Sequence, residues 1–353
     1  MKSPWIYYSD TYLNHQTDGH PESPERLKRI LWQLDQSNLW KHLHRETPRA
    51  IDRDILLRLH SETYLHELEA FCKASGSGRR IDEDTIASQG TFAAAMEAAG
   101  SAIEMTDALL SDRCDTAFSF VRPPGHHAMP SHTMGFCFFN NVALAAIYAI
   151  ERLGLKRVAI LDWDAHHGNG TEHMFYADPR VLFVSWHQDP NWPGTGAITD
   201  IGEGAGIGFN INIPLPKGSG DQVFLNTYQT LVAPALAKFK PELILISAGY
   251  DAHHADILTQ MGLTATGFGQ LTEEILKQAE ALCHGKVGFL LEGGYNVHAL
   301  ANSVASTLET VLHQEARPFA ESLGQAPETD PAMLGPIITQ IKTVQTLLKE
   351  DDA

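Results

Sequence analysis

The chain has 353 residues, of which 43% are hydrophobic, enough to bury a large core. Acidic residues outnumber basic ones by 43 to 26, which gives a formal net charge of −17 at pH 7. Nucleic-acid binding needs clustered lysine and arginine to replace the counterions of the phosphates, so this balance argues against a nucleic-acid partner. An acidic surface suits a cationic substrate, but solubility alone explains it more simply.

The four cysteines are scattered and form no Cys-x-x-Cys pair. This spacing is typical of a reducing compartment, and it argues against both a disulfide framework and a thiolate metal site. The N-terminal sequence lacks the apolar segment of a secretory signal, and no later run approaches 18 apolar residues. We therefore expect a cytoplasmic protein with no membrane partner, while the oligomeric state is left open.

The first hundred residues are expected to be mostly helical. Ser23, Pro24 and Glu25 make a helix start, with serine as the N-cap and proline in the first turn. The apolar positions within residues 27–34 share one helical face. Residues 91–110 form an alanine-rich segment, which predicts a helix that packs closely on a sheet.

From about residue 116, short apolar runs alternate with helical patterns. The predicted strands are 116–121, 158–161, 181–185, 209–213, 243–247 and 287–291. The intervening helices include 141–153, 221–239 and 269–283. Buried strands that alternate with helices predict an α/β fold with a mainly parallel, doubly wound sheet. Sites in such folds form beyond the carboxyl ends of the strands.

After about residue 315 the alternation of strands and helices stops. A polar segment with three prolines leads to an amphipathic helix predicted over residues 337–348. We therefore predict one main domain over residues 1–315 and a tail over residues 316–353 that packs on it.

Four polar clusters each follow a predicted strand. They are RPPGHH (122–127), DWDAHHGNG (162–170), AGYDAHH (248–254) and EGGYN (292–296). Because the carboxyl ends of parallel strands meet at one edge of a sheet, we expect these clusters to share a single crevice.

The second cluster predicts a metal site. Residues i and i+2 of an extended strand point the same way, so Asp162, Asp164 and His166 would project to one side. Such a set suits Zn²⁺, Fe²⁺ or Mn²⁺, and a catalytic metal needs about three protein ligands. Asp164 and His166 supply two, and Asp251, at the end of another strand, is the best third. The alternative is a solvated loop or an ordinary salt bridge.

The first and last clusters predict acid/base and oxyanion chemistry. His126 and His127 perturb each other's titration, which favours different protonation states. Asp162 and Asn169 are candidates to orient them. Tyr295 follows two glycines and could donate to a developing oxyanion. The alternatives are structural histidines and a core tyrosine. Of the remaining histidines, His253 and His254 are expected at the surface.

A nucleophilic hydrolase is not favoured. The sequence has no Gly-x-Ser-x-Gly elbow, and no cysteine stands in a motif with a partner histidine.

These blocks resemble the histone deacetylase family. The blocks that carry the resemblance are RPPGHHA (122–128), GFCFFNNVA (135–143), DWDAHHGNGT (162–171) and EGGYN (292–296), within a likeness that runs from about residue 5 to 312. The residues of these blocks are more similar to those of the class II branch and its bacterial relatives than to those of class I. The resemblance implies an arginase-like α/β domain that hydrolyses acetyl amides with Zn²⁺ on Asp164, His166 and Asp251.

The resemblance also implies the roles of individual residues. His127 would be the general base and then the acid, His126 its electrostatic partner backed by Asp162, and Tyr295 the group that polarises the acetyl carbonyl. A structural K⁺ would be bound by Ser185 and by the backbone carbonyls of Asp162, Asp164, His166 and Trp186, with a second monovalent ion near residues 175–181. The implied substrate-binding residues are Gly135, Phe136, Trp192, Leu258 and Gly294.

Several departures from the family pattern bear on the substrate. Asn169 replaces the aspartate of class I members, as it does in class II. The presence of Tyr295 argues against the weakly active class IIa type. Gly90 falls where relatives carry an acid or serine that grips the substrate backbone. Leu258 stands where polyamine-selective relatives place glutamate, and their inserted dimerisation loop is absent.

The sequence therefore favours an acetyl-lysine deacetylase over an acetylpolyamine amidohydrolase. A pseudoenzyme that binds acylated lysine without hydrolysing it is the alternative of another class, and the complete set of predicted site residues argues against it.

Overall fold

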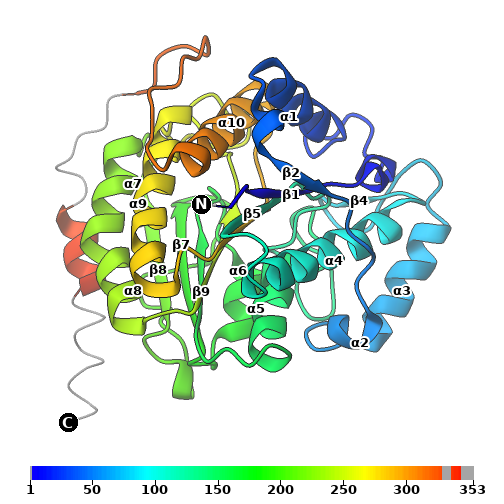
Figure 1. Ribbon diagram of the computed structural model, residues 1–353. Helices are drawn as coiled ribbons and strands as arrows, with labels where there is room; N and C mark the ends of the chain where they lie inside the picture. The colour runs from blue at the N-terminus through cyan, green and yellow to red at the C-terminus, as the bar shows by residue number, and fades with distance from the viewer. Residues whose placement is uncertain (1, 328–334, 343–353) are drawn as a thin grey trace.

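The computed structural model describes residues 2–327 and 335–342, and an eight-stranded sheet forms its centre (Figure 1). The strand order is β2-β1-β5-β10-β9-β6-β7-β8, and every neighbouring pair is parallel. The strands are β1 (Trp5–Tyr7), β2 (His44–Glu46), β5 (Thr116–Ser119), β6 (Val158–Asp162), β7 (Val181–Gln188), β8 (Asn210–Leu215), β9 (Leu243–Ala248) and β10 (Val287–Leu291). Outside the sheet, β3 (Arg79–Arg80) and β4 (Ile86–Ala87) form an antiparallel ribbon.

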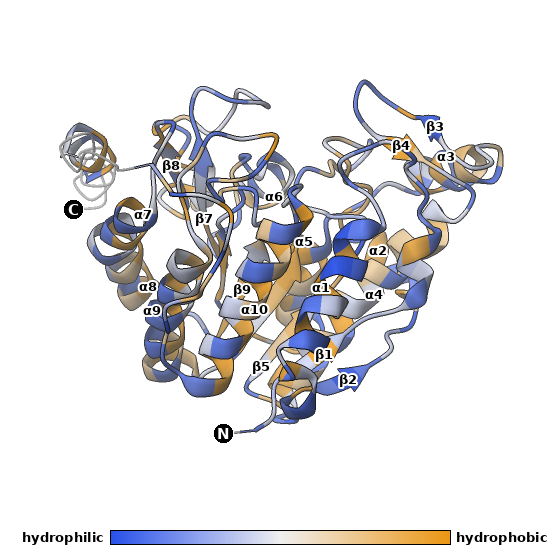
Figure 2. Cartoon of the chain, turned by 90° about the horizontal axis from the view of Figure 1, so that it is seen from above, coloured by the Kyte–Doolittle hydropathy of each residue, from blue (hydrophilic) through white to orange (hydrophobic). Residues whose placement is uncertain are grey.

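Helices cover both faces of the sheet, as Figures 1 and 2 show. One layer holds α1 (Glu25–Gln36), α7 (Asp221–Thr227), α8 (Ala233–Phe239), α9 (Ala265–Cys283) and α10 (Val297–His313). The other holds α4 (Thr91–Leu110), α5 (Asn141–Glu151) and α6 (Asn169–Phe175), with α2 (Arg53–Leu56) and α3 (Glu62–Lys73) beside them. Every residue of the five central strands β5, β10, β9, β6 and β7 is buried, as a sheet covered on both faces requires. The predicted doubly wound α/β sheet is confirmed.

The structure corrects the sequence-based elements in three places. The first hundred residues also contain β1 and β2, which were missed because three-residue strands show no periodicity and β2 is polar and largely exposed. The single helix predicted over 221–239 is divided by a π-helical turn, Tyr228–Val232, just before Pro234, which has no N–H to continue the ladder. Helix α9 begins at Ala265, where the Thr264 hydroxyl caps it, and not at residue 269.

The tail packs on the domain where the structure describes it. Residues 335–342 are helical, and Ile341 is buried in the same cluster as the layer of α9 and α10. The amide of Phe319 donates to the Thr266 hydroxyl of α9 at 2.9 Å. Residues 343–348 of the predicted helix lie outside the described residues, and the boundary at residue 315 stays a prediction.

The register of the sheet positions the polar clusters. Asp162 at the end of β6 is level with Ser247 of β9 and with Ser185 of β7. Ser247 is in turn level with Leu290 of β10. The segments after β6, β9 and β10 therefore leave three neighbouring strands at the same edge.

A buried carboxylate joins α1 to this edge. Glu22 accepts from Arg26 at 3.1 Å and from Arg122 at 2.7 Å, and it lies 3.3 Å from the His15 ring. All four side chains are buried. Burial alone would raise the pKa of Glu22, but the charge of Arg122 and the hydrogen bonds from His15 and Arg122 lower it well below its usual value.

We predict that Glu22→Gln lowers the free energy of unfolding by about 3–5 kcal/mol, because it leaves two buried guanidinium groups without a counter-charge. Glu25→Gln, which removes an exposed ion pair with Lys28 on the same helix, should cost less than about 1 kcal/mol. Denaturant unfolding followed by circular dichroism measures both changes. Equal losses in the two variants would contradict the assignment.

Candidate active site

Three of the predicted residues bring ligand atoms together at the edge of the sheet. The Nδ1 atom of His166 lies 3.1 Å from an Asp164 oxygen and 3.0 Å from an Asp251 oxygen. The Asp164 and Asp251 carboxylates also accept from backbone amides, at His166 and Ala165 respectively, both at 2.8 Å. The loop after β6 thus fixes both carboxylates around its own histidine.

The chemistry of this set fits a divalent metal. A single Nδ1 proton cannot serve two carboxylates fully, and burial together with the charge of Asp164 raises the pKa of Asp251 to about 7. A cation in place of that proton would keep both carboxylates ionised. Metal–ligand bonds of about 2.0–2.2 Å separate tetrahedral ligands by about 3.3 Å, close to the observed spacing.

Two other groups of possible ligands within the described residues fit a metal less well. Glu292 is occupied by the amides of Gly125 (2.6 Å) and His126 (3.1 Å), and burial raises the pKa of the adjacent Cys137 well above its usual value. In the group of His253, His254 and Glu321, the Nδ1 atom of His253 accepts from a backbone amide. Its Nε2 therefore carries the proton that it donates to Glu321 at 2.9 Å.

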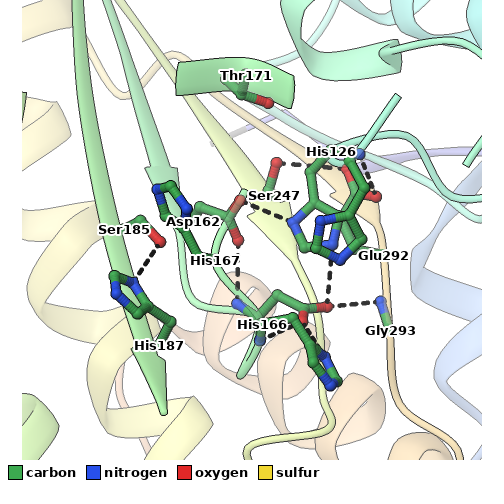
Figure 3. Close-up of polar contacts among 12 residues, drawn as sticks. His126, Asp162, His166, His167, Thr171, Ser185, His187, Ser247, Glu292 and Gly293 are labelled. Atoms are coloured by element: carbon green, nitrogen blue, oxygen red, sulfur yellow. Dashed lines mark hydrogen bonds and ion pairs between the residues drawn. The ribbon is translucent and has the colours of Figure 1, made fainter. Parts of the chain in front are cut away.

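The two adjacent histidines have different partners. Nδ1 of His126 lies 2.9 Å from the Asp162 carboxylate, and Figure 3 draws this contact as a dashed line. Nδ1 of His127 lies 2.8 Å from the side-chain oxygen of Asn169. Because that oxygen only accepts, His127 carries its proton on Nδ1 and leaves Nε2 free to take another.

The surroundings of these two rings also give them different protonation states. Burial would lower the pKa of His126, but the negative charges of Asp162, Asp164 and Glu292 raise it to about 10. Burial and the positive charges of His126 and His166 lower the pKa of His127 well below its usual value. The pair therefore holds one imidazolium and one neutral imidazole.

Tyr295 lies on the turn that leaves β10. The Gly293 amide donates to the Asp164 carboxylate at 2.8 Å (Figure 3), and a Cβ on Gly293 would collide with the carboxylates of Asp164 and Asp251. On the other side, the Arg26 guanidinium donates to the Gly294 carbonyl at 2.7 Å and stacks 5.3 Å from the Tyr295 ring. The turn before Tyr295 is therefore fixed between the Asp164 carboxylate and the Arg26 guanidinium.

Aromatic side chains line the approach to these groups. The Phe136 ring lies 5.7 Å from Tyr295, and the Trp192 ring lies 4.7 Å from His127. Gly135 is wedged between His127 and Trp192 at a φ of 55°, where a Cβ would strike both rings. Phe136 has a φ of 69°, and its amide is held by the Thr85 hydroxyl at 3.1 Å. Backbone in this region is costly for a bulky residue and is typical of functional sites.

The predicted potassium residues lie deeper, between β6 and β7. The Ser185 hydroxyl is 3.0 Å from Nδ1 of His187 (Figure 3), and the neighbouring Trp186 is fully buried. The two strands place Ser185 opposite Asp162. The assignment of carbonyl ligands there stays a prediction.

Leu258 and Gly294, the last two predicted substrate-binding residues, have different surroundings. Leu258 is 40% exposed and, with the neighbouring Ile257, borders a cleft of about 940 Å³ against residues 13–28. Gly294 turns its carbonyl to Arg26 and packs on Tyr250 and Leu300.

One expectation from the sequence is wrong: His253, expected at the surface, is fully buried. Gly90 packs against the Asn14 carbonyl, with which a Cβ at this position would collide. The loop before α4 also contains Asp84, whose carboxylate is hydrogen-bonded to the backbone of Gly135.

Three residues that shape the site were not predicted from the sequence. Glu292 stands inside the EGGYN motif and Arg26 directly follows the helix start at Ser23–Glu25, but their partners come from distant segments. Asp256, whose carboxylate contacts the Tyr295 amide, lies in no motif, and only its place five residues after Asp251 could have drawn attention to it.

The chain matches known proteins over most of its length. Residues 20–311 match the family model described as "Histone deacetylase domain". The "Probable deacetylase" of Archaeoglobus fulgidus is 41% identical over 295 residues, covering 83% of this chain and 81% of the relative. The "Histone deacetylase-like amidohydrolase" of Pseudomonas aeruginosa is 42% identical over 280 residues, covering 79% and 73%.

A solved structure is similar throughout. The crystal structure of the HDA15 HD domain superposes with a TM-score of 0.86 at 30% identity and covers 97% of this chain and 96% of that one. Within the described residues, no helix is long and apolar enough to cross a membrane.

We predict that Asp251→Asn removes the divalent metal. Loss of a direct ligand should weaken metal affinity by more than the about 10–100-fold that loss of a supporting partner costs. Glu321→Gln, which alters the His253 group, should leave the metal content unchanged. Elemental analysis of dialysed protein measures both, and metal lost only from the Glu321 variant would place the site elsewhere.

Proposed function

The chain belongs to the histone deacetylase family and is a hydrolytic deacetylase, and we propose that it cleaves the acetyl amide of acetyl-lysine with Zn²⁺ held by Asp164, His166 and Asp251. The observation that carries this proposal is the convergence of these three ligand atoms beside one charged histidine, one neutral histidine and Tyr295. The family resemblance in the sequence is confirmed by the match over residues 20–311.

The metal supplies Lewis acidity toward a water molecule and the acetyl oxygen. Fe²⁺ would suit the same carboxylate and imidazole ligands, so the choice of Zn²⁺ over Fe²⁺ is itself proposed. We also propose one structural K⁺ at Ser185 and the carbonyls of Asp162, Asp164, His166 and Trp186, with a second monovalent ion near residues 175–181.

His127 is the proton carrier in this proposal. Its Nε2 is unprotonated because Nδ1 donates to Asn169. It therefore takes a proton from the attacking water and returns it to the leaving amine. A neutral amide partner stabilises the resulting imidazolium less than a carboxylate would, which keeps His127 able to release the proton.

His126 keeps its charge throughout. Its hydrogen bond to Asp162 and its closeness to Asp164 stabilise the imidazolium. That fixed positive charge stabilises negative charge as it develops on the substrate, and it disfavours early protonation of His127.

Tyr295 is the oxyanion donor. The glycine turn brings its ring against Phe136, at the base of the aromatic approach. Its hydroxyl donates to the acetyl oxygen as that atom gains negative charge. Burial, with the charges of Asp251 and Asp164, raises the pKa of Tyr295 well above its usual value, so the phenol keeps its proton.

The shape of the approach favours an acylated lysine side chain. Phe136 and Trp192 form walls for an alkyl chain, the Gly135 carbonyl accepts the amide N–H, and Gly294 completes the turn at the acyl end. At the mouth, Ile257 and Leu258 are exposed and apolar, and they offer no carboxylate to a second amine. A small acylated polyamine is therefore the second candidate.

We predict that Tyr295→Phe lowers kcat by about 10²–10³, because loss of one oxyanion donor has that effect. KM and metal content should change little, since the phenol acts on charge that develops in the transition state. Steady-state kinetics on a fluorogenic acetyl-lysine peptide measure the change. A variant that keeps full kcat would remove Tyr295 from the mechanism.

We predict that acetyl-lysine peptides exceed acetylspermidine and acetylputrescine in kcat/KM, and that Leu258→Glu shifts this ratio toward the polyamines by about 10-fold through attraction of the distal amine. Leu258→Gln is the control of matched size. A wild-type preference for acetylpolyamines of about 100-fold, or about 2.7 kcal/mol, would reverse the substrate assignment.

A further inference from the structure

One side chain joins the substrate mouth to the catalytic tyrosine. The Oδ2 atom of Asp256 accepts from the amides of Tyr295 at 2.7 Å and Asn296 at 3.1 Å. Its Oδ1 atom accepts from the Leu258 amide at 2.9 Å. Three backbone N–H groups from two loops therefore end on a single half-buried carboxylate.

Asn296 closes the same junction from the opposite direction. Its side-chain amide donates to the Ala255 carbonyl at 2.8 Å, and its side-chain oxygen caps α10 through the amides of His298 and Ala299. The loop over residues 255–258 and the start of α10 are thus tied together on either side of Tyr295.

The turn that carries Tyr295 needs such support. It begins with two glycines, and Gly294 has a φ of 117°, a conformation that the backbone adopts at little cost only without a side chain. Asp164 holds the turn at the Gly293 amide and Arg26 holds it at the Gly294 carbonyl. The Asp256 carboxylate acts on the backbone amide of the tyrosine itself and on that of the residue after it.

We propose that Asp256 is a positioning residue that fixes the Tyr295 hydroxyl for catalysis and couples its position to the loop at the substrate mouth. The carboxylate also holds the backbone of Leu258 at the proposed substrate mouth, so a substrate too small to reach that loop isolates its effect on Tyr295. The inference rests on the proposed role of Tyr295 as oxyanion donor.

A double-mutant cycle tests the coupling. Asp256→Ala should lower kcat on free Nε-acetyl-lysine by about 10- to 100-fold, since misplacement of a catalytic group by about 1 Å has effects of that size. In a Tyr295→Phe background the same substitution should change kcat by less than about twofold, because the group that it positions is absent. The small substrate removes any contribution from peptide contacts with the mouth loop.

Two further variants separate positioning from loss of structure. Asp256→Asn keeps one oxygen for the amides of Tyr295 and Asn296 and gives up only the Leu258 contact, so its kcat should stay within about threefold of wild type. Asp221→Ala removes another loop-holding carboxylate, one that accepts from the Thr264 amide at 2.9 Å. It should lower the Tm without lowering kcat.

The outcomes are distinguishable. Coupled losses in the cycle, with rescue by asparagine and normal metal content, support the inference. The inference is overturned if the losses in kcat from Asp256→Ala and Tyr295→Phe are fully additive in the double variant. It is also overturned if Asp221→Ala lowers kcat as much as Asp256→Ala does. Either result leaves the proposed function intact. A Tyr295→Phe enzyme with unchanged kcat instead overturns the proposed function itself.

Discussion

The structure depends on buried negative charge at one edge of its sheet. Asp162, Asp164, Asp251 and Glu292 end or follow three neighbouring strands, and all four are buried. Carboxylates at this density repel one another in a low dielectric, so each must be compensated. Backbone amides and the imidazolium of His126 compensate part of this charge, and the divalent metal that we propose at Asp164, His166 and Asp251 would compensate the rest. The groups that compensate the charge of these four carboxylates are therefore also the groups to which we assign the chemistry.

The same requirement separates the two adjacent histidines. His126 faces the carboxylates and takes up a proton, whereas His127 faces the neutral amide of Asn169 and loses its charge to burial and to its neighbour. A second carboxylate in place of Asn169 would reduce that difference. The pair can be poised for proton transfer without any change in conformation, because the asymmetry lies in fixed partners within the strand-end loops.

The features that could be predicted from the sequence are those that depend on the spacing of residues close together in the chain. The alternation of Asp164 and His166 after a buried strand indicated a metal site, and the alternation of strands and helices indicated the sheet. The missing parts depend on contacts between distant segments. Asp256 meets Tyr295 across 39 residues of sequence, and Arg26 meets Gly294 across 268. Strands β1 and β2 are too short to show a pattern and are recognised by their pairing in the sheet, and His253 is bonded to Glu321, which lies 68 residues further along the chain.

The turn before Tyr295 shows how the site reconciles close approach with rigidity. Gly293 must lack a side chain because two carboxylates of the metal-ligand group occupy that space. Glycine, however, leaves the backbone more conformational freedom than any other residue. The positional order that Tyr295 would need as the proposed oxyanion donor must therefore come from outside the turn. Arg26 supplies this order by holding the Gly294 carbonyl, and Glu22 compensates the charge of Arg26. Asp256 supplies it by holding the Tyr295 amide. Tyr295, which follows two glycines, is thus held by side chains outside the proposed metal ligands and proton carriers.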